Sequence, residues 1–489
     1  MSQSPLHIYF FPLLSPGHMI PVVDMARQFA RHDTNVKSTI VLTHLDAPRF
    51  HSTIERDNQQ GSNITIRQVT FPTAQAGLPD DCGSLAHITS TEMYARFNDA
   101  MNLLSIPVEQ LLIEDRPDCF VSDFFIPWTA DLATKLRIPR IAFHVTGFFP
   151  LCVHDSLIKH KPHVGLDMDT PFVVPGFLDV VTMTKRQLPN ILQNESLEKL
   201  ANEIIDNSKE AQFASYGVIL NSFKELERDY IEHYKTNVCS KAWHVGPVSL
   251  CNTNTVDKVG RGGGDVDERK KTTEKYCLDW LNTKEKNSVV YVCYGTLSVF
   301  SAAQTLGIAA GLESCGRDFI WVVKNEEGTL PEGFEERVGE RGLLIKSWAP
   351  QVLILEHESV GGFLTHCGWN SLLEGVTAGK PMITWPISSE QFDNENLITK
   401  VLKIGVGVGS VEWTERLDVP KGLIEGEDIA KAVNEVMVGD ESVEMRNRVK
   451  VLSEYAKKAV EKGGSSYEDL DSLFEELRLI KASSDEVYT

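Results

Sequence analysis

The stretch from Trp348 to Gln391 constrains the fold of this chain more than any other part of the sequence. At its centre, residues 359–366 (SVGGFLTH) form a short apolar run that predicts a buried strand. The turn HCGW follows, and then a helix that Asn370 or Ser371 can cap and that Gly379 ends. A strand, a glycine turn and a helix start direct backbone N–H groups and the helix dipole at one point, where an anion fits. We interpret this element as a phosphate-binding turn.

The same stretch carries side chains suited to the rest of a nucleotide. It lacks the pattern GxxxxGK[ST], which excludes a nucleoside triphosphatase loop. Trp348 offers an aromatic face for a base, and Gln351 and Glu374 suit ribose hydroxyls. After the apolar run MITWPI, the pair Glu390 and Gln391 suits the hydroxyls of a sugar. Each residue alone has an ordinary alternative, a core tryptophan or a solvated glutamate, so the prediction depends on their combination.

The chain length and the alternation of patterns predict the domain organisation. A chain of 489 residues is too long for one core. Strand-like runs alternate with helical patterns in residues 1–250 and again in residues 276–465, which predicts two doubly wound α/β domains. The polar, glycine-containing segment 251–275 is interpreted as a linker without packed elements, and residues 466–489 as a final helix.

Two titratable residues mark one edge of the first predicted sheet. His18 lies in the loop PLLSPGHMIP, between the strand 7–11 and a helix that starts near Val22, and Asp123 ends the strand 119–123. Ligands of parallel sheets bind beyond the carboxyl ends of the strands. A base and its orienting carboxylate can therefore meet at this edge, although an ordinary loop histidine is the commoner case.

The stretch 348–391 resembles the nucleotide-sugar signature of the plant family 1 UDP-glycosyltransferases. The Trp at its first position, the HCGWNS core, the downstream Glu and the final acidic–Gln pair all match. The resemblance covers nearly the whole chain and is closest to the branch that acts on triterpenoid and steroid sapogenins and on flavonoids. It implies the GT-B fold, with two facing Rossmann-like domains, a cleft between them, and a last helix that packs back on the first domain.

The resemblance also implies roles for individual residues. His18 in PGHM would be the general base, and Asp123 in VSDFFIPW its carboxylate partner. Donor-binding roles are implied for Thr146, Thr296, Trp348, Ala349, Gln351, His366, Trp369, Asn370, Ser371, Glu374, Glu390 and Gln391. For Thr296, simple capping of a turn is an equal alternative. An apolar acceptor pocket is expected to include Phe124, Phe148, Phe149, Met183 and Leu188.

The implied reaction moves a sugar from UDP to an acceptor hydroxyl with inversion and without a metal or other cofactor. A helix N-terminus and His366 would neutralise the developing charge on the diphosphate, while His18 deprotonates the acceptor. In this family a final Gln with Trp in the core tends to accompany UDP-glucose, although Ser388 and Ser389 depart from the usual Phe-Ala. A triterpenoid sapogenin or saponin is the expected acceptor, with a flavonoid or other phenol as the alternative.

Composition and other motifs limit the alternatives. A net charge of −20 argues against nucleic acid and anionic membranes, and nine scattered cysteines fit a reducing compartment. We expect a cytoplasmic monomer without a membrane span. Two DxD sequences, residues 167–169 and 265–267, are interpreted as polar loops.

Two other functional classes remain to be weighed. An NAD-dependent oxidoreductase would need GxGxxG after the first strand, which this chain lacks. A non-catalytic nucleotide-sugar binding protein would keep the signature but have no use for His18 and Asp123.

Overall fold

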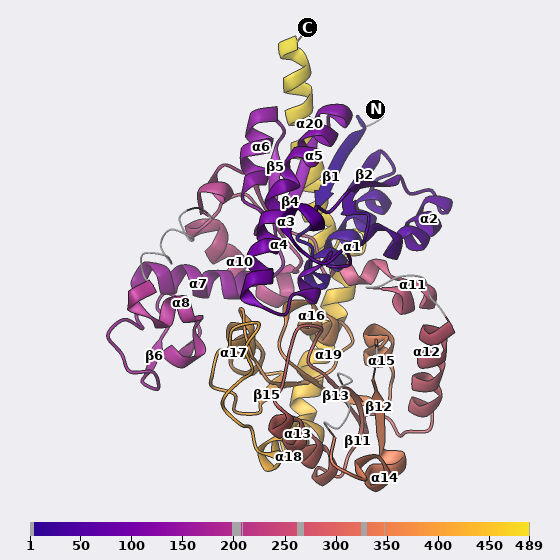
Figure 1. Cartoon of the computed structure of the whole chain (residues 1–489), viewed down its shortest axis with the longest axis vertical. Coiled ribbons are helices and arrows are strands. Elements are labelled where there is room, and N and C mark those ends of the chain that lie inside the picture. Colours follow the sequence, from indigo (N-terminus) through magenta and orange to yellow (C-terminus); the bar gives the residue numbers. More distant parts are fainter. Residues whose placement is uncertain are drawn as a thin grey trace. The chain divides into compact units, whose positions relative to one another are not determined.

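The computed structural model of the chain describes residues 4–197, 207, 209–261, 268–323, 330–346 and 348–488 (Figure 1). The chain divides into two compact units. The first comprises residues 1–148, 202–265 and 457–489, and the second comprises residues 149–201 and 266–456. This division differs from the predicted boundary at residue 250, because residues 149–201 group with the second unit. Their described part, residues 149–197, adds no strand to the first sheet; β6 (Pro171–Val173) and β7 (Thr182–Thr184) form a separate antiparallel pair.

The first unit is built on a parallel sheet of seven strands in the order β3-β2-β1-β4-β5-β8-β9. The strands are β1 (Leu6–Phe11), β2 (Val36–Thr43), β3 (Ile64–Val69), β4 (Cys119–Asp123), β5 (Arg140–His144), β8 (Gly217–Leu220) and β9 (Ala242–His244). Runs such as FVSD in β4 are buried throughout because helices cover both faces of a parallel sheet. The strand order reverses between β1 and β4, which makes this edge the expected ligand site of the sheet.

The helices of the first unit correct one prediction. The helix expected from Val22 begins at Pro16. Residues 91–115 form two helices that meet at Leu104. The helices are α1 (Pro16–His32), α2 (His51–Gln59), α3 (Thr73–Ala76), α4 (Thr91–Leu103), α5 (Ser105–Asp115), α6 (Trp128–Leu136), α10 (Lys224–Asn237), α11 (Thr255–Gly260) and α20 (Ser465–Tyr488).

The segment 251–275 is not the unpacked linker that its polarity predicts. It contains α11 and the start of α12 (Glu268–Leu281). In α11, the carboxylate of Asp257 is 1% exposed and accepts hydrogen bonds from Arg27 at 2.9 Å and Arg56 at 2.8 Å. These buried ion pairs join α11 to α1 and α2 across more than two hundred positions of sequence, which is why local composition does not reveal them.

The last helix, α20, belongs to the first unit and packs against β9 and β1, where Figure 1 draws it in yellow. The Ser466 hydroxyl donates to the carbonyl of Gly246 at 2.6 Å, and Nε of Arg478 donates to the carbonyl of Ser4 at 3.1 Å. The C-terminal segment therefore completes the first unit.

The second unit is built on a six-stranded parallel sheet in the order β12-β11-β10-β13-β14-β15. Along β10, Val289 and Tyr291 enter one hydrophobic cluster and Val290 and Val292 enter another, so apolar cores lie on both faces. The strand order reverses between β10 and β13, again marking a ligand site. The strands are β10 (Val289–Cys293), β11 (Asp318–Val322), β12 (Gly342–Ile345), β13 (Val360–Thr365), β14 (Met382–Thr384) and β15 (Gly405–Gly407).

The second unit also contains helices. They are α7 (Phe148–His160), α8 (Asn190–Gln193), α12, α13 (Ala302–Ser314), α14 (Phe334–Val338), α15 (Gln351–Glu356), α16 (Trp369–Thr377), α17 (Gln391–Asn396), α18 (Gly426–Val438) and α19 (Ser442–Ala459). Within the described ranges, no helix has the length and apolarity needed to cross a bilayer.

Candidate active site

His18 and Asp123 meet at the edge of the first sheet where the strand order reverses. Nδ1 of His18 lies 2.7 Å from Oδ2 of Asp123. The backbone N–H of Phe125 donates to the other carboxylate oxygen at 3.0 Å. The Asp123 side chain is 1% exposed and that of His18 is 15% exposed, so the carboxylate is shielded while the imidazole remains accessible. A histidine oriented in this way can act as a general base.

His18 lies in the first turn of α1, not in the loop that the sequence predicts. Ser15 is the N-cap, with extended backbone, and Pro16 occupies the first helical position, which suits a residue without an N–H. The backbone N–H of His18 donates to the carbonyl of Ser15 at 2.9 Å. Pro16 and Pro21 make the segment resemble a loop, yet α1 accommodates both in its first two turns.

The predicted phosphate-binding turn lies at the corresponding edge of the second sheet, after β13. Helix α16 begins at Trp369 with Gly368 as its N-cap, so Asn370 and Ser371 are helical residues and not caps. The Leu372 N–H donates to the carbonyl of Gly368 at 3.1 Å. The first N–H groups of a helix have no acceptor within the helix itself, which makes the start of α16 a candidate anion site.

His366 packs against Gly368 of this turn and against Gly295 of the turn that follows β10. A Cβ on Gly295 would lie 2.7 Å from the imidazole Cε1, and one on Gly368 would lie 2.4 Å from Nε2. Burial lowers the pKa of His366 to about 4. Its Nδ1 has no hydrogen-bond partner among the described residues, which leaves it able to bond a ligand. His366 is therefore neutral near pH 7 and offers a hydrogen bond, not the positive charge that we expected.

Three of the predicted donor-binding residues form one hydrogen-bonded group. Nε2 of Gln351 donates to Glu374 at 2.7 Å and to the Ser371 hydroxyl at 3.3 Å. The hydroxyl of Tyr291, a residue that we did not predict, donates to Oε1 of Gln351 at 3.3 Å. A carboxylate and an amide held together in this way suit the two hydroxyls of a ribose.

Gln391 and Glu390 follow β14 at the start of α17. Oε1 of Gln391 accepts the backbone N–H groups of Ile387 at 2.9 Å and Ser388 at 3.0 Å. Ser389 completes this loop with a φ of 53°, a conformation that costs energy for a residue with a side chain. The Gln391 carbonyl oxygen is thus used to hold the loop, which leaves its amide N–H groups for a ligand.

The remaining predicted donor-binding residues differ in the solvent exposure of their side chains. Trp348 is partly exposed, and Ala349 is buried. Trp369 is only 3% exposed, so most of its ring belongs to the core. Thr296 is exposed beside Gly295. Thr146 lies in the first unit, and its hydroxyl has no partner among the described residues.

The residues expected to form the acceptor pocket are mostly core residues. Those buried to 2% exposure or less are Phe148, Phe149, Met183 and Leu188. Phe124 packs against His144 in a tilted arrangement, with ring centroids 4.3 Å apart. The exposed aromatic residue beside the dyad is instead Phe125, 62% exposed, whose ring centroid lies 5.8 Å from that of His18. The role of the five predicted residues in an acceptor pocket stays a prediction.

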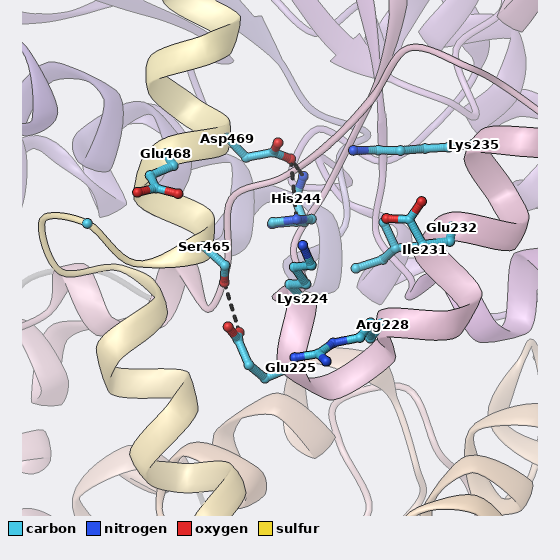
Figure 2. Close-up of a pocket in the computed structure, with 11 residues that line it drawn as sticks. Lys224, Glu225, Arg228, Ile231, Glu232, Lys235, His244, Ser465, Glu468 and Asp469 are labelled. Carbon is cyan, nitrogen blue, oxygen red and sulfur yellow. Dashed lines mark hydrogen bonds and ion pairs between the residues drawn. The ribbon is translucent and has the colours of Figure 1, made fainter.

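A hollow of about 430 Å³ lies elsewhere in the first unit, where the start of α20 meets α10 (Figure 2). Two of its acidic side chains are held by neighbouring residues. The Ser465 hydroxyl donates to Glu225 at 2.8 Å, and Asp469 accepts the backbone N–H of His244 at 2.8 Å. None of the predicted site residues lines it, and we interpret it as the joint that holds α20.

The acidic motifs do not form a metal site in the described part of the chain. Asp169 of the first DxD sequence is 75% exposed and binds Arg186 at 2.7 Å. The second DxD sequence, residues 265–267, lies outside the described residues. No group of three or more His, Cys, Asp or Glu side chains within the described ranges is arranged to hold a metal ion.

Two Rossmann-like parallel sheets of seven and six strands, each with its candidate site at the reversal of strand order, define a GT-B glycosyltransferase. The family model described as UDP-glucoronosyl and UDP-glucosyl transferase matches residues 88–447. The chain belongs to this family and is a UDP-glycosyltransferase.

Individual relatives are similar over almost their full length. The scopoletin glucosyltransferase of Nicotiana tabacum is 47% identical over 96% of this chain and 98% of its own. The UDP-glucose flavonoid 3-O-glucosyltransferase 7 of Fragaria ananassa is 48% identical over 96% of both chains. The crystal structure of Glycyrrhiza uralensis UGT73P12 complexed with glycyrrhetinic acid 3-O-monoglucuronide is 40% identical. It superposes with a TM-score of 0.92 and covers 99% of this chain and 98% of that one.

Proposed function

We propose that this chain transfers glucose from UDP-glucose to a hydroxyl group of a small lipophilic plant metabolite, with inversion at the anomeric carbon. The observation that carries the catalytic part of the proposal is the 2.7 Å hydrogen bond between His18 and the buried carboxylate of Asp123. The names of the relatives, which include glucosyltransferases of scopoletin and a flavonoid, support the sugar and the kind of acceptor.

In the proposed reaction His18 is the general base. Asp123 accepts the Nδ1 proton of the imidazole, so Nε2 is the nitrogen that takes the proton of the acceptor hydroxyl. The acceptor oxygen then attacks the anomeric carbon from the face opposite UDP, and the bond from that carbon to the diphosphate oxygen breaks. UDP leaves with the electron pair, and Asp123 stabilises the imidazolium that has formed.

The second unit supplies the donor site in this proposal. The N–H groups at the start of α16 bind the diphosphate and stabilise the charge that develops on it, which is the task a metal performs in other transferases. Neutral His366 adds a hydrogen bond. Gln351 and Glu374 hold the ribose, Trp348 stacks on the uracil, and the amide of Gln391 binds the sugar. Full activity in the presence of a chelator would support this arrangement, and loss that Mg²⁺ or Mn²⁺ restores would overturn it.

A triterpenoid sapogenin or saponin is our first candidate for the acceptor. It is supported by the similarity to UGT73P12, which was solved with a triterpenoid glucuronide. A phenolic acceptor is the second candidate, because the scopoletin and flavonoid glucosyltransferases share more identity with this chain. We further propose that the enzyme acts in the cytoplasm as a monomer.

An assay of UDP release with a panel of acceptors tests the proposal. We expect release with UDP-glucose and a sapogenin or flavonol, a β-glucoside as product, and slower turnover with UDP-galactose or UDP-glucuronate. A binding protein without activity would hold UDP-glucose but release no UDP with any acceptor, and NAD binding would indicate an oxidoreductase.

A further inference from the structure

A buried arginine lies directly behind the dyad. Arg140, the first residue of β5, is 2% exposed, and Nη2 of its guanidinium donates to the backbone carbonyl of Asp123 at 3.1 Å. Nε donates to the hydroxyls of Ser122 at 2.7 Å and Thr129 at 3.0 Å. Nη1 donates to the hydroxyl of Ser215 at 2.6 Å.

These acceptors leave the charge of Arg140 without a bonded counter-ion. Each of them is a hydroxyl or a backbone carbonyl, and within the described residues no carboxylate makes an ion pair with the guanidinium. Burial lowers the pKa of Arg140 to about 10, and the charge of Asp123 acts in the opposite direction, so the guanidinium is cationic at neutral pH. A buried cation normally has an anionic partner, and the carboxylate of Asp123 is the buried anion that influences it.

The other titratable groups near this pair are His18 of α1 and His144 of β5. His144 is 4% exposed, its Nε2 lies 3.1 Å from Oε1 of Gln212, and burial lowers its pKa to about 4. It is therefore neutral over the range in which an assay is possible. His18, Asp123 and Arg140 are then the groups of this cluster that can carry a charge at neutral pH.

We propose that Arg140 is a positioning residue of the reaction, whose buried positive charge keeps Asp123 ionised and lowers the proton affinity of His18. This role depends on the proposed function of His18 as the base. A cation beside a buried carboxylate favours its ionised form, and a cation beside an imidazole disfavours the imidazolium. Removal of the charge raises the proton affinity of both groups. Whether Asp123 or His18 takes up the proton, the imidazole stops acting as a base at a higher pH than in the wild type.

The pH dependence of kcat/KM tests this role. In Arg140→Gln, the acid limb of the profile is expected to move to higher pH by about one unit, the lower end of the effect of a nearby charge. In Arg140→Lys, which keeps the charge, the limb is expected to stay within about 0.3 unit of the wild type. An unmoved limb in an active Arg140→Gln enzyme would overturn the proposal.

A second pair of variants keeps the test valid if Arg140→Gln does not fold. Ser215 is only partly buried, so Ser215→Asp can place a negative charge against the guanidinium without removing it. We expect the same upward movement of the acid limb. Ser215→Asn changes the same contact without a charge, and we expect it to lower stability but leave the limb in place. If the acid limbs of the kcat/KM profiles of these two variants lie at the same pH, shifted or not, the electrostatic role is wrong.

The failure of this inference can be distinguished from failure of the proposed function. If His18→Ala is inactive and Arg140→Gln and Ser215→Asp keep the wild-type limb, His18 is the base and Arg140 is only structural. If His18→Ala keeps its activity, the proposed base is wrong and the inference falls with it.

Discussion

Nδ1 of His18 lies 2.7 Å from Oδ2 of Asp123, although 105 positions of sequence separate the two residues. The sheet accounts for this proximity. β1 pairs directly with β4, with Phe11 opposite Ser122, so the segments that follow these strands leave the sheet side by side. α1 begins shortly after β1 and carries His18 in its first turn, while Asp123 ends β4.

Replacing Asp123 by Asn is expected to reduce kcat by about 10²- to 10⁴-fold, the range of general base catalysis. The amide can still accept the N–H of Phe125, but its NH₂ would face Nδ1 of His18 and place the imidazole proton on Nε2. The base would then have no lone pair for the acceptor hydroxyl.

The matched control for this variant is Asp169→Asn. Asp169 is an exposed aspartate paired with Arg186 in the DxD sequence. Its replacement should leave kcat within about twofold of the wild type, whereas a large loss would restore a metal-binding role to that motif.

Gly295→Ala is expected to weaken UDP binding about tenfold or more. Gly295 has a φ of 73°, and the new Cβ would meet the imidazole of His366 at 2.7 Å. Gly316→Ala is the control, because Gly316 has a φ of 70° and no heavy atom within 4 Å of the added Cβ. Both variants lose about 1 kcal/mol of stability from backbone strain. Calorimetric titration with UDP should separate them, and equal affinities would remove His366 from the donor site.

Gln391→Glu is expected to raise the KM for UDP-glucose about tenfold with little loss of stability. The new carboxylate can still accept the N–H groups of Ile387 and Ser388, so the loop is retained. It cannot donate to a sugar hydroxyl. Gln391→Ala should also destabilise the loop, and a comparison of KM and melting temperature in the two variants distinguishes the two functions of the side chain. A normal KM in Gln391→Glu would argue against a contact with the sugar.

Acidification should destabilise the second unit through His366. Its pKa is lowered from 6.5 to about 4 in the folded state. The unfolded chain therefore takes up a proton first as the pH falls, and the folded state loses stability between those values. Relative to His366→Gln, the wild type should lose roughly 2 kcal/mol between pH 7 and pH 5. Denaturant titrations at both pH values measure this difference. If the free energies of unfolding of the wild type and of His366→Gln fall by the same amount, the pKa of His366 is not lowered in the folded state.

The strands and the candidate site were predictable to different extents. β4 was predicted with its observed limits because a dense apolar run is a local signal. The turn after β13 was equally visible, since its strand, glycine and helix start are contiguous in sequence. The start of α1 was missed because Pro16 and Pro21 resemble loop residues, although a first helical turn tolerates Pro16.

Features that depend on distant partners could not be read from the sequence. The ion pairs of Asp257 with Arg27 and Arg56 turn a polar segment into a packed helix. Arg140 begins a strand in RIAFH and gives no local sign that its charge will be buried behind Asp123. Phe124 and Phe125 are equal in hydrophobicity, and only the fold shows which of them is exposed beside His18.

The central claim is that His18 removes the proton of the acceptor while a separate turn holds UDP-glucose. The most direct test measures, in His18→Ala, both the turnover of the best acceptor and the Kd for UDP. We predict that kcat falls by about 10²- to 10⁴-fold while the Kd for UDP stays within about twofold of the wild type. Turnover close to that of the wild type in this variant would contradict the account.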